Sequence, residues 1–325
     1  MKVLIAVLNW GLGHATRSAA LVYRHLAKGD DVVIGGDGES LAWLKHQFPK
    51  LRAIPFAPLR LRYSKGRSQI PAMIKAAPKV LISAYWDHKL LNELLEAEHF
   101  DLVISDNRFG MYSRKTRCVY MTHQLHIELP RGWQWLSGLT DRLHRAFYKH
   151  YDEVWIPDYE DINISLAGEL SHPVESGESR IESRKYIGPL SRFEYTPQPS
   201  TRYLSGNYKT VAVLSGLEPQ RSLFEKEIIR RFQGTSQSLL VVRGKPREPF
   251  MRVTNDNVTI VPWLNDDELR DAMTKAELII ARSGYSTIMD LQCLGLLKKA
   301  ELHPTPGQSE QEYLGKYILL QTTCK

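Results

Sequence analysis

The chain has 325 residues, which suits two domains of roughly 150 residues better than one. Hydrophobic residues make up 43% of it, enough to bury a core in each domain, and no stretch approaches the roughly 18 consecutive apolar residues of a membrane-spanning helix. The formal net charge of +7 points to an anionic partner, although no zinc-finger spacing or RNA-binding aromatic signature favours nucleic acid. Residues 1–8 predict a buried strand rather than a signal peptide, so we expect a cytoplasmic protein.

Short apolar runs alternate with longer helical patterns along the whole chain, which predicts parallel sheets covered by helices. A Pro-, Ser- and Thr-rich stretch at 189–206 is the expected linker between a first domain, 1–188, and a second domain, 207–325. The fold class expected is therefore α/β, with two Rossmann-like domains facing across a cleft and ligands at the carboxyl ends of the strands. The expected strands are 2–8, 32–35, 101–105, 117–121, 153–156, 210–214, 238–243, 258–261, 278–281 and 299–302, and the expected helices are 14–28, 39–48, 74–97, 133–150, 221–232, 266–276, 286–294 and 309–318.

A glycine-rich loop follows the first predicted strand. Gly11 and Gly13 permit a tight turn and the close approach of a ligand, and His14 stands at the head of the next helix. A dinucleotide fingerprint would have a third glycine at position 16, where this chain has Thr16, while Asp37 lies at a tolerable distance for a ribose-binding acid. Binding of NAD at this loop therefore stays open.

The segment 281–290 carries the most information. An apolar strand turns through Ser283 and Gly284 into a helix, whose free N–H groups and dipole favour a phosphate. One turn on, Asp290 can accept hydrogen bonds from a ribose, and after the next apolar stretch Gln308 and Gln311 suit a hexose. Diphosphate, ribose and sugar contacts in this order are what a nucleotide sugar needs, whereas the plain alternative is a strand-turn-helix with a polar surface.

This pattern resembles the donor-binding half of the two-domain (GT-B) glycosyltransferases, in particular the peptidoglycan UDP-N-acetylglucosamine transferase-like family (glycosyltransferase family 28-like). Asp290 stands where such proteins usually have Glu. The resemblance implies a hexosyltransferase that moves a sugar from a UDP-linked donor to an acceptor hydroxyl, with inversion and without a metal or cofactor. The matching positions are Arg282, Ser283, Gly284, Ser286, Thr287, Asp290, Gly295, Pro304, Pro306, Gln308 and Gln311.

The same resemblance implies roles for other loops. His14 becomes the candidate general base, with Asp106 as the alternative, since a helix N-terminus disfavours a protonated histidine. The acceptor side would include Gly11, Gly13, Arg108 and His123; on the donor side, Ser215 and Gly216 would contact the diphosphate, Arg221 and Arg243 would offset its charge, and Trp263 and Leu264 would hold the base. Histidines 123 and 126 alone make an incomplete metal site, so no metal is expected.

Two readings compete with the transferase: a nucleotide-sugar hydrolase of the same fold, and a non-catalytic nucleotide-sugar-binding protein. The expected partners are a nucleotide sugar and a carbohydrate or lipid-linked acceptor, not nucleic acid. Four basic residues in 59–67, followed by an amphipathic stretch at 70–80, could rest on an anionic membrane surface or form a solvated loop and helix. In proteins of the resembling family the C-terminal segment crosses back to the first domain, and few residues follow the last predicted helix here for such a crossing.

Overall fold

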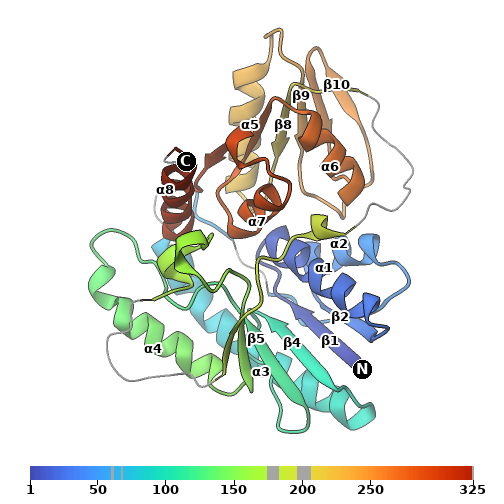
Figure 1. Cartoon of the computed structure of the whole chain (residues 1–325), viewed down its shortest axis with the longest axis vertical. Coiled ribbons are helices and arrows are strands. Elements are labelled where there is room, and N and C mark those ends of the chain that lie inside the picture. Colours follow the sequence, from blue (N-terminus) through green and yellow to red (C-terminus); the bar gives the residue numbers. More distant parts are fainter. Residues whose placement is uncertain (60–61, 67–68, 174–182, 196–205, 324–325) are drawn as a thin grey trace.

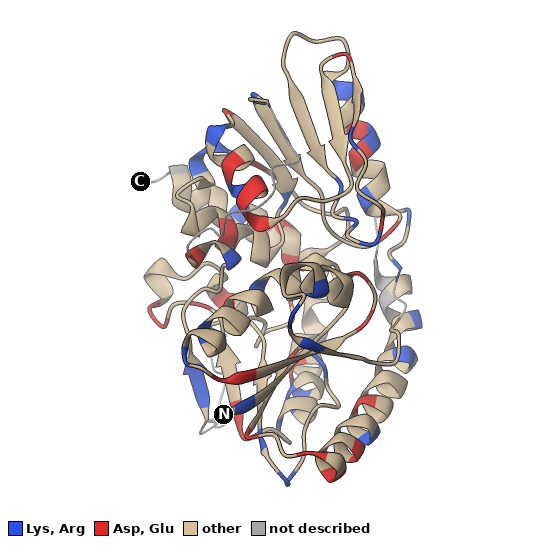
Figure 2. Ribbon diagram, turned by 90° about the vertical axis from the view of Figure 1, so that its right-hand side faces the viewer, with Lys and Arg blue, Asp and Glu red and all other residues tan. Residues whose placement is uncertain are grey.

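A computed structural model describes residues 1–59, 62–66, 69–173, 183–195 and 206–323 of the chain. Two α/β domains lie one above the other along the long axis of the molecule (Figure 1). Lys and Arg are spread over both domains, so the positive charge is not gathered in one of them (Figure 2). Within the described part of the chain, no helix is long and apolar enough to cross a membrane.

The first domain is built on a seven-stranded sheet in the order β3-β2-β1-β4-β5-β6-β7, in which every neighbouring pair is parallel. Its central strands are apolar and buried on both faces, as parallel strands between helices must be. The strands are β1 (Lys2–Val7), β2 (Asp31–Gly36), β3 (Arg52–Pro55), β4 (Leu102–Asp106), β5 (Arg117–Met121), β6 (Glu153–Ile156) and β7 (Arg184–Tyr186), and the helices are α1 (Leu12–Ala27), α2 (Gly38–Gln47), α3 (Ile70–Ala97) and α4 (Ser137–Tyr148).

The second domain has a six-stranded sheet in the order β10-β11-β9-β8-β12-β13, parallel except for the antiparallel edge strand β10. Its helix α6 begins with a reciprocal capping box between Asn265 and Glu268. The strands are β8 (Thr210–Val213), β9 (Leu239–Val242), β10 (Val253–Asn255), β11 (Val258–Val261), β12 (Leu278–Arg282) and β13 (Ala300–His303), and the helices are α5 (Gln220–Phe232), α6 (Asp266–Lys275), α7 (Tyr285–Cys293) and α8 (Ser309–Thr323).

All ten predicted strands and all eight predicted helices are present, with ends that differ by a few residues. Three further strands, β3, β7 and β10, were not predicted. They are only three or four residues long and mostly exposed or partly exposed, so they lack the apolar run on which the prediction depends. Helix α3 begins at Ile70, four residues before the predicted start, with a proline in its first turn, where the missing N–H costs nothing.

A continuous hydrophobic core joins the two domains. One cluster of buried side chains runs from Val3 and Ile5 of the first sheet through helix α1 to Ile288 and Met289 of α7 and Leu314 of α8. Helix α8 also reaches the first domain through polar contacts, because the Tyr317 hydroxyl donates to the carbonyl oxygen of Ser165 at 3.2 Å. The sequence left few residues after the last predicted helix for a return to the first domain. Helix α8 itself makes part of this contact with the first domain.

The start of the predicted linker packs between the domains. Leu190 is fully buried in the shared core, and Ser191 caps a short 3-10 helix, Arg192–Glu194, in a capping box with Glu194. Residues 196–205 lie outside the described part of the chain. The segment at 189–195 is thus a packed connection, because its apolar and capping residues find partners in both domains.

Candidate active site

Each sheet has a point where its strand order reverses, and these two points face each other. In the first sheet the reversal lies between β1 and β4, and in the second between β8 and β12. Loops that follow such strands form a crevice at the carboxyl edge of the sheet, where ligands bind in this class of fold. A cavity of about 280 Å³ lies there, lined by residues of both domains. The predicted site residues that line it are Gly11, Gly13, His14, His123, Ser215, Gly216, Trp263, Leu264, Gly284, Ser286, Asp290, Gln308 and Gln311.

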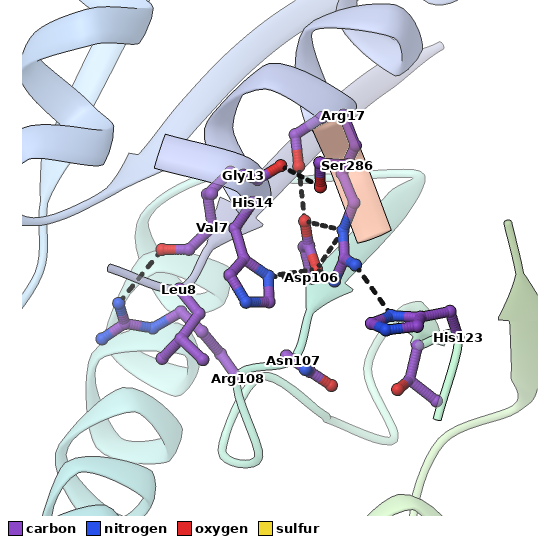
Figure 3. A network of polar contacts seen from close by, with 12 residues as sticks. Val7, Leu8, Gly13, His14, Arg17, Asp106, Asn107, Arg108, His123 and Ser286 are labelled. Atoms are coloured by element: carbon purple, nitrogen blue, oxygen red, sulfur yellow. Dashed lines mark hydrogen bonds and ion pairs between the residues drawn. The ribbon is translucent and has the colours of Figure 1, made fainter. Parts of the chain in front are cut away.

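His14 lies in the first turn of α1 and its side chain is 14% exposed. Its Nδ1 is 2.9 Å from Oδ1 of Asp106, the last residue of β4 (Figure 3). Asp106 is fully buried and also accepts hydrogen bonds from the Arg17 guanidinium and, at 2.9 Å, from the Ser18 hydroxyl. Nη2 of Arg17, which can only donate, also lies 2.9 Å from Nδ1 of His14. In the tautomer that donates Nδ1–H to the ionised Asp106, Nε2 of His14 keeps the lone pair that a base needs.

The protonation states of this pair fit that arrangement. Burial lowers the pKa of His14 below its ordinary value; Asp106 opposes this lowering and Arg17 adds to it. Burial by itself would raise the pKa of Asp106, but Arg17 and His14 outweigh it and hold that pKa well below the usual range. At neutral pH the pair is therefore a neutral imidazole oriented by a carboxylate, as general-base catalysis requires.

A second histidine, His123, connects the two domains beside this pair. Arg17 donates to its Nδ1 at 3.1 Å, and its Nε2 lies 2.9 Å from Oε1 of Glu310, in the first turn of α8. The imidazole also stacks on the ring of Tyr285, with 4.1 Å between ring centres and 5° between planes. A continuous polar network thus runs from Asp106 in the first domain to Glu310 in the second.

Two glycine loops meet across the cavity. Gly11 and Gly216 both have a positive φ, at 84° and 95°, which L side chains rarely adopt. A Cβ on Gly11 would lie only 3.4 Å from Cα of Gly216. Next to them, the Ser286 hydroxyl donates to the carbonyl oxygen of Gly13 at 2.8 Å. Ser286, predicted to contact the donor, therefore bridges the domains in this arrangement.

The start of helix α7 lies against the loop that carries His14, because Ser286 contacts Gly13. Residues 284–287 line the cavity, and the first N–H groups of a helix have no acceptor within it. Ser283 is fully buried and is not among the described residues that line the cavity, because its hydroxyl donates to the carbonyl oxygen of Gln311 at 2.7 Å. Its role here is to tie the turn before α7 to the start of α8.

Asp290, the predicted ribose ligand, is held by the linker. Its Oδ1 accepts from the Ser191 hydroxyl at 2.7 Å, and its Oδ2 accepts from Nε of Arg192 at 3.2 Å. Arg192 also donates to Asp266 at 3.0 Å and itself lines the cavity, with its guanidinium over the ring of Trp43. Burial raises the pKa of Asp290, partly opposed by Arg192. This acid is therefore oriented by two linker side chains.

The end of the cavity predicted to hold the base is covered by helix α2 of the first domain. The ring of His46 stacks on Trp263, with 4.9 Å between centres, and its Nε2 lies 2.9 Å from the carbonyl oxygen of Pro246. Trp263 and Leu264 line the cavity beneath this contact. A nucleoside base would lie there between the two domains.

The two glutamines predicted to bind the sugar both line the cavity, but their side-chain oxygens differ in hydrogen bonding. Gln311 uses its Oε1 to accept from the backbone N–H of Thr305 at 2.8 Å, which fixes the loop before α8. Oε1 of Gln308 is buried and has no hydrogen-bond partner among the described residues. A buried acceptor without a partner is costly, so Gln308 is the glutamine suited to take a ligand hydroxyl.

Three predicted arginines are not among the described residues that line the cavity. Arg108 is buried and donates to Asp37 and Asp87, pointing away from His14 toward the carbonyl oxygen of Val7 (Figure 3). Its partner Asp37, the ribose candidate of the NAD alternative, is therefore bound within the first domain.

Arg221 and Arg243 are held by partners of their own. Arg221 bonds to Glu218 and to the carbonyl oxygen of Gly244. Arg243 pairs with Glu225 at 3.0 Å and with Glu248 at 3.1 Å. The guanidinium groups of Arg221 and Arg243 are therefore already paired with protein acceptors.

Sequence reasoning did not name several residues that line the cavity, among them Arg17, Arg192, Glu310 and Tyr285. Arg17 lies one helical turn after His14, and Glu310 lies between two residues that were named, so both had a signal in their spacing. Tyr285 likewise lies between two named residues, Gly284 and Ser286, whereas Arg192 had no such signal, because only the folded chain brings it to the cavity.

Comparison with known proteins bears on this geometry. No protein-family model matches the sequence. The chain is 24% identical over 328 residues to an uncharacterised glycosyltransferase of Methanosarcina acetivorans, covering 96% of this chain and 82% of that one. It is 23% identical, over 56% of its length and 52% of the relative, to the UDP-N-acetylglucosamine–N-acetylmuramyl-(pentapeptide) pyrophosphoryl-undecaprenol N-acetylglucosamine transferase of a Sulfurihydrogenibium species.

Solved structures agree over almost the whole chain. The kitacinnamycin glycosyltransferase superimposes with a TM-score of 0.59 at 13% identity, covering 99% of this chain and 84% of that one. The chain has the GT-B fold of this glycosyltransferase. UGT89C1 of Arabidopsis thaliana, in complex with UDP-L-rhamnose, shares the fold with a TM-score of 0.57 at 12% identity, covering 98% of this chain and 82% of that one.

The expected fold class and the resemblance to glycosyltransferases are thereby confirmed for this GT-B chain. A putative UDP-N-acetylglucosamine 2-epimerase of Listeria monocytogenes has the same fold, with a TM-score of 0.56 at 14% identity over 99% of this chain and 89% of that one. Proteins with this fold are therefore named for more than one reaction of nucleotide sugars, so the reaction has to be inferred from the residues of the site.

Proposed function

We propose that this chain transfers a sugar from a nucleoside diphosphate sugar to an acceptor hydroxyl, with inversion at the anomeric carbon and without a metal ion. The observation that carries the proposal is the His14–Asp106 pair, which lies at the cavity between the domains with Nδ1 bonded at 2.9 Å and the pKa of His14 lowered. UDP is the first candidate nucleotide, because relatives in sequence and fold are named for UDP-sugars.

The step is a single displacement. Nε2 of His14 takes the proton of the acceptor hydroxyl as its oxygen attacks the anomeric carbon, and the bond from that carbon to the diphosphate oxygen breaks. The electron pair leaves with the nucleoside diphosphate. Its charge is then stabilised by N–H groups at the start of α7, which are fixed in place before the reaction.

The donor would lie along the second domain. Its diphosphate would lie against residues 284–287 and 215–216, its ribose against Asp290, and its base near Trp263 and Leu264. The sugar would then reach Gln308, whose buried Oε1 has no hydrogen-bond partner in the described part of the chain, and come close to His14.

Calorimetry with a panel of nucleotides and nucleotide sugars tests the donor site. We expect a UDP-class ligand to bind wild type, and Asp290→Ala to weaken it by about tenfold or more, the effect of losing a charged hydrogen bond. Asp271→Ala, at a half-exposed carboxylate on α6, is the matched control and should bind normally. Binding of NAD alone, with no response to any nucleotide sugar, would move the ligand to the Gly11 loop and end the proposal.

A hydrolase is the second candidate, since His14 could activate water as well as a hydroxyl and the fold also houses a putative epimerase. Time courses of donor consumption separate the reactions. Consumption that depends on an added acceptor, and that continues in EDTA, supports metal-independent transfer. Full-rate consumption without any acceptor identifies a hydrolase, and tight binding without turnover on a broad panel of donors and acceptors identifies a binding protein.

A further inference from the structure

Helix α2 of the first domain supplies a wall of the cavity at the end where the ribose is predicted to lie. Its residue Trp43 lines the cavity and is only 4% exposed. The guanidinium of Arg192, which holds Asp290, lies over the Trp43 ring, 5.5 Å from its centre. Trp43 therefore packs directly behind the group that orients the predicted ribose ligand.

The same helix also contacts the loops of the second domain that are predicted to hold the base. His46, three residues after Trp43, is exposed and stacks on Trp263, with 22° between the ring planes. At the start of α2, the Glu39 carboxylate accepts from the backbone N–H of Arg247 at 3.4 Å. Helix α2 is thus fixed across the cleft at both its ends.

The start of α1 continues this wall, so that it faces apolar side chains of the second domain. A Cβ on Gly244 would lie 3.4 Å from Cδ1 of Leu12, which also lines the cavity. Apolar residues that line the cavity from the second domain include Val213, Leu214, Val242, Leu264 and Leu269. Aromatic and apolar walls of this kind suit a flat, mostly apolar group that carries a few polar atoms, such as a nucleoside base.

We propose that helix α2 forms the second wall of the nucleoside site, with Trp43 against the nucleoside and His46 bridging the cleft above it through Trp263. The inference rests on the proposed function, because it takes the ligand of the cavity to be a nucleoside diphosphate sugar. It gives the first domain a part in donor binding, since the other predicted donor contacts all come from the second domain. Stacking on an aromatic side chain accepts any base, so α2 contributes affinity for the nucleoside and not the choice of base.

A contact that only joins the domains would also bury Trp43 and stack His46 on Trp263. The two explanations differ in what they predict for nucleotides. A purely structural contact changes the stability of the protein, whereas a wall of the nucleoside site changes the affinity for every ligand that contains the nucleoside.

Calorimetry with UDP and with UMP distinguishes them. His46→Ala and Trp43→Leu should each weaken the binding of both nucleotides about two- to tenfold, the usual effect of losing an aromatic contact. The fold-change should be the same for UDP and UMP, because the contact is made to the nucleoside that they share. His46→Phe and Trp43→Phe keep a ring at each position and should restore most of the affinity.

Amide hydrogen exchange tests the same contact in the unaltered protein. UDP should slow exchange within residues 38–47 of α2 as well as within 285–293 of α7, because the nucleotide would lie between these helices. A nucleotide held by the second domain alone would protect α7 and leave α2 unchanged.

His99→Ala is the matched control, because His99 is an exposed histidine of the first domain that is bonded to Asp101 at 3.0 Å and is not among the described residues that line the cavity. It should bind both nucleotides like wild type, and melting curves establish that every variant is folded. Unchanged UDP affinity in either α2 variant, a loss confined to UDP, or unaltered exchange within 38–47 would overturn this inference and leave the proposed function intact. Wild type that binds neither nucleotide would instead contradict the UDP donor on which the inference rests.

Discussion

At the scale of single residues, the chemistry depends on how His14 is held. Asp106 fixes the imidazole through Nδ1 at 2.9 Å, and Arg17 holds Asp106 ionised by charge and hydrogen bonds. Arg17 also lowers the pKa of His14, so one cation keeps the acid charged and the base neutral. This coupling explains why two histidines and an arginine are packed together beside a buried carboxylate.

His14→Gln should lower kcat by about 10²–10⁴-fold, the usual contribution of a general base, while donor affinity in calorimetry stays near that of wild type. In wild type the acid limb of kcat/KM should lie below about pH 6.5, because the pKa of His14 is lowered and activity is lost only when the imidazole becomes protonated. Asp106→Asn should move this limb to still lower pH, since Asp106 favours the charged imidazole. An acid limb above pH 7 would contradict the assignment.

At the scale of elements, the short 3-10 helix of the linker joins two acids of the second domain. Arg192 lies between Asp266, at the start of α6, and Asp290 on α7. Burial and the nearby Asp290 raise the pKa of Asp266 to about 6, and Oδ2 of Asp266 is buried without a hydrogen-bond partner among the described residues. One arginine thus balances two buried carboxylates, which makes the junction sensitive to pH.

The stability of the protein should show this sensitivity. Because the folded state raises the pKa of Asp266, it binds an extra proton between about pH 4 and pH 6, and the stability gained from that proton is lost as the pH rises through this window. Asp266→Asn removes the titration, so its stability relative to wild type should rise by about 1–3 kcal/mol from pH 4.5 to pH 7.5. Melting temperatures at both values measure the difference. Asp271→Asn on the same helix is the control, and a parallel response of both variants would refute the argument.

At the scale of the whole molecule, the two domains are held close by contacts around the cavity. Ser286 bonds to Gly13, and His123 pairs with Glu310. The residues that make these contacts come from both domains and also line the cavity. The distance between the domains therefore influences how a ligand fits in the cavity. Gly13 at this contact therefore matters because it has no side chain to separate the domains, and not only because glycine has a flexible backbone.

Gly13→Ala tests how tightly the domains must close. Its new Cβ would lie 3.0 Å from the hydroxyl oxygen and 3.3 Å from Cβ of Ser286. Crowding of this kind costs about 1–3 kcal/mol, so kcat should fall roughly 5- to 160-fold with a smaller effect on donor affinity. Steady-state kinetics and calorimetry give the two quantities. Adding Ser286→Gly should restore part of the rate by removing the opposing side chain, and Gly138→Ala, where nothing lies within 4 Å, should leave it unchanged.

Periodicity and turn residues in the sequence determined most of the fold. Buried parallel strands such as β4 and β5 are continuous apolar runs, which a local pattern is enough to predict. The loops of the site were also visible, because glycines and polar residues directly follow strands at Gly11, Gly216 and Ser283. Short edge strands such as β7 have no such pattern, so they depend on their neighbours for pairing.

Only the tertiary structure decided which of those loop residues share the cavity. His14 and Asp106 are 92 positions apart and meet because β1 and β4 are neighbours at the reversal of strand order. Arg108, two residues further on, turns into a buried ion pair instead, and Arg192 leaves the linker to hold Asp290. A local sequence pattern determines secondary structure because turns, caps and apolar periodicity act between residues close in the chain. The pairing of buried charges depends instead on contacts between residues far apart in the chain, which form only when the domains pack.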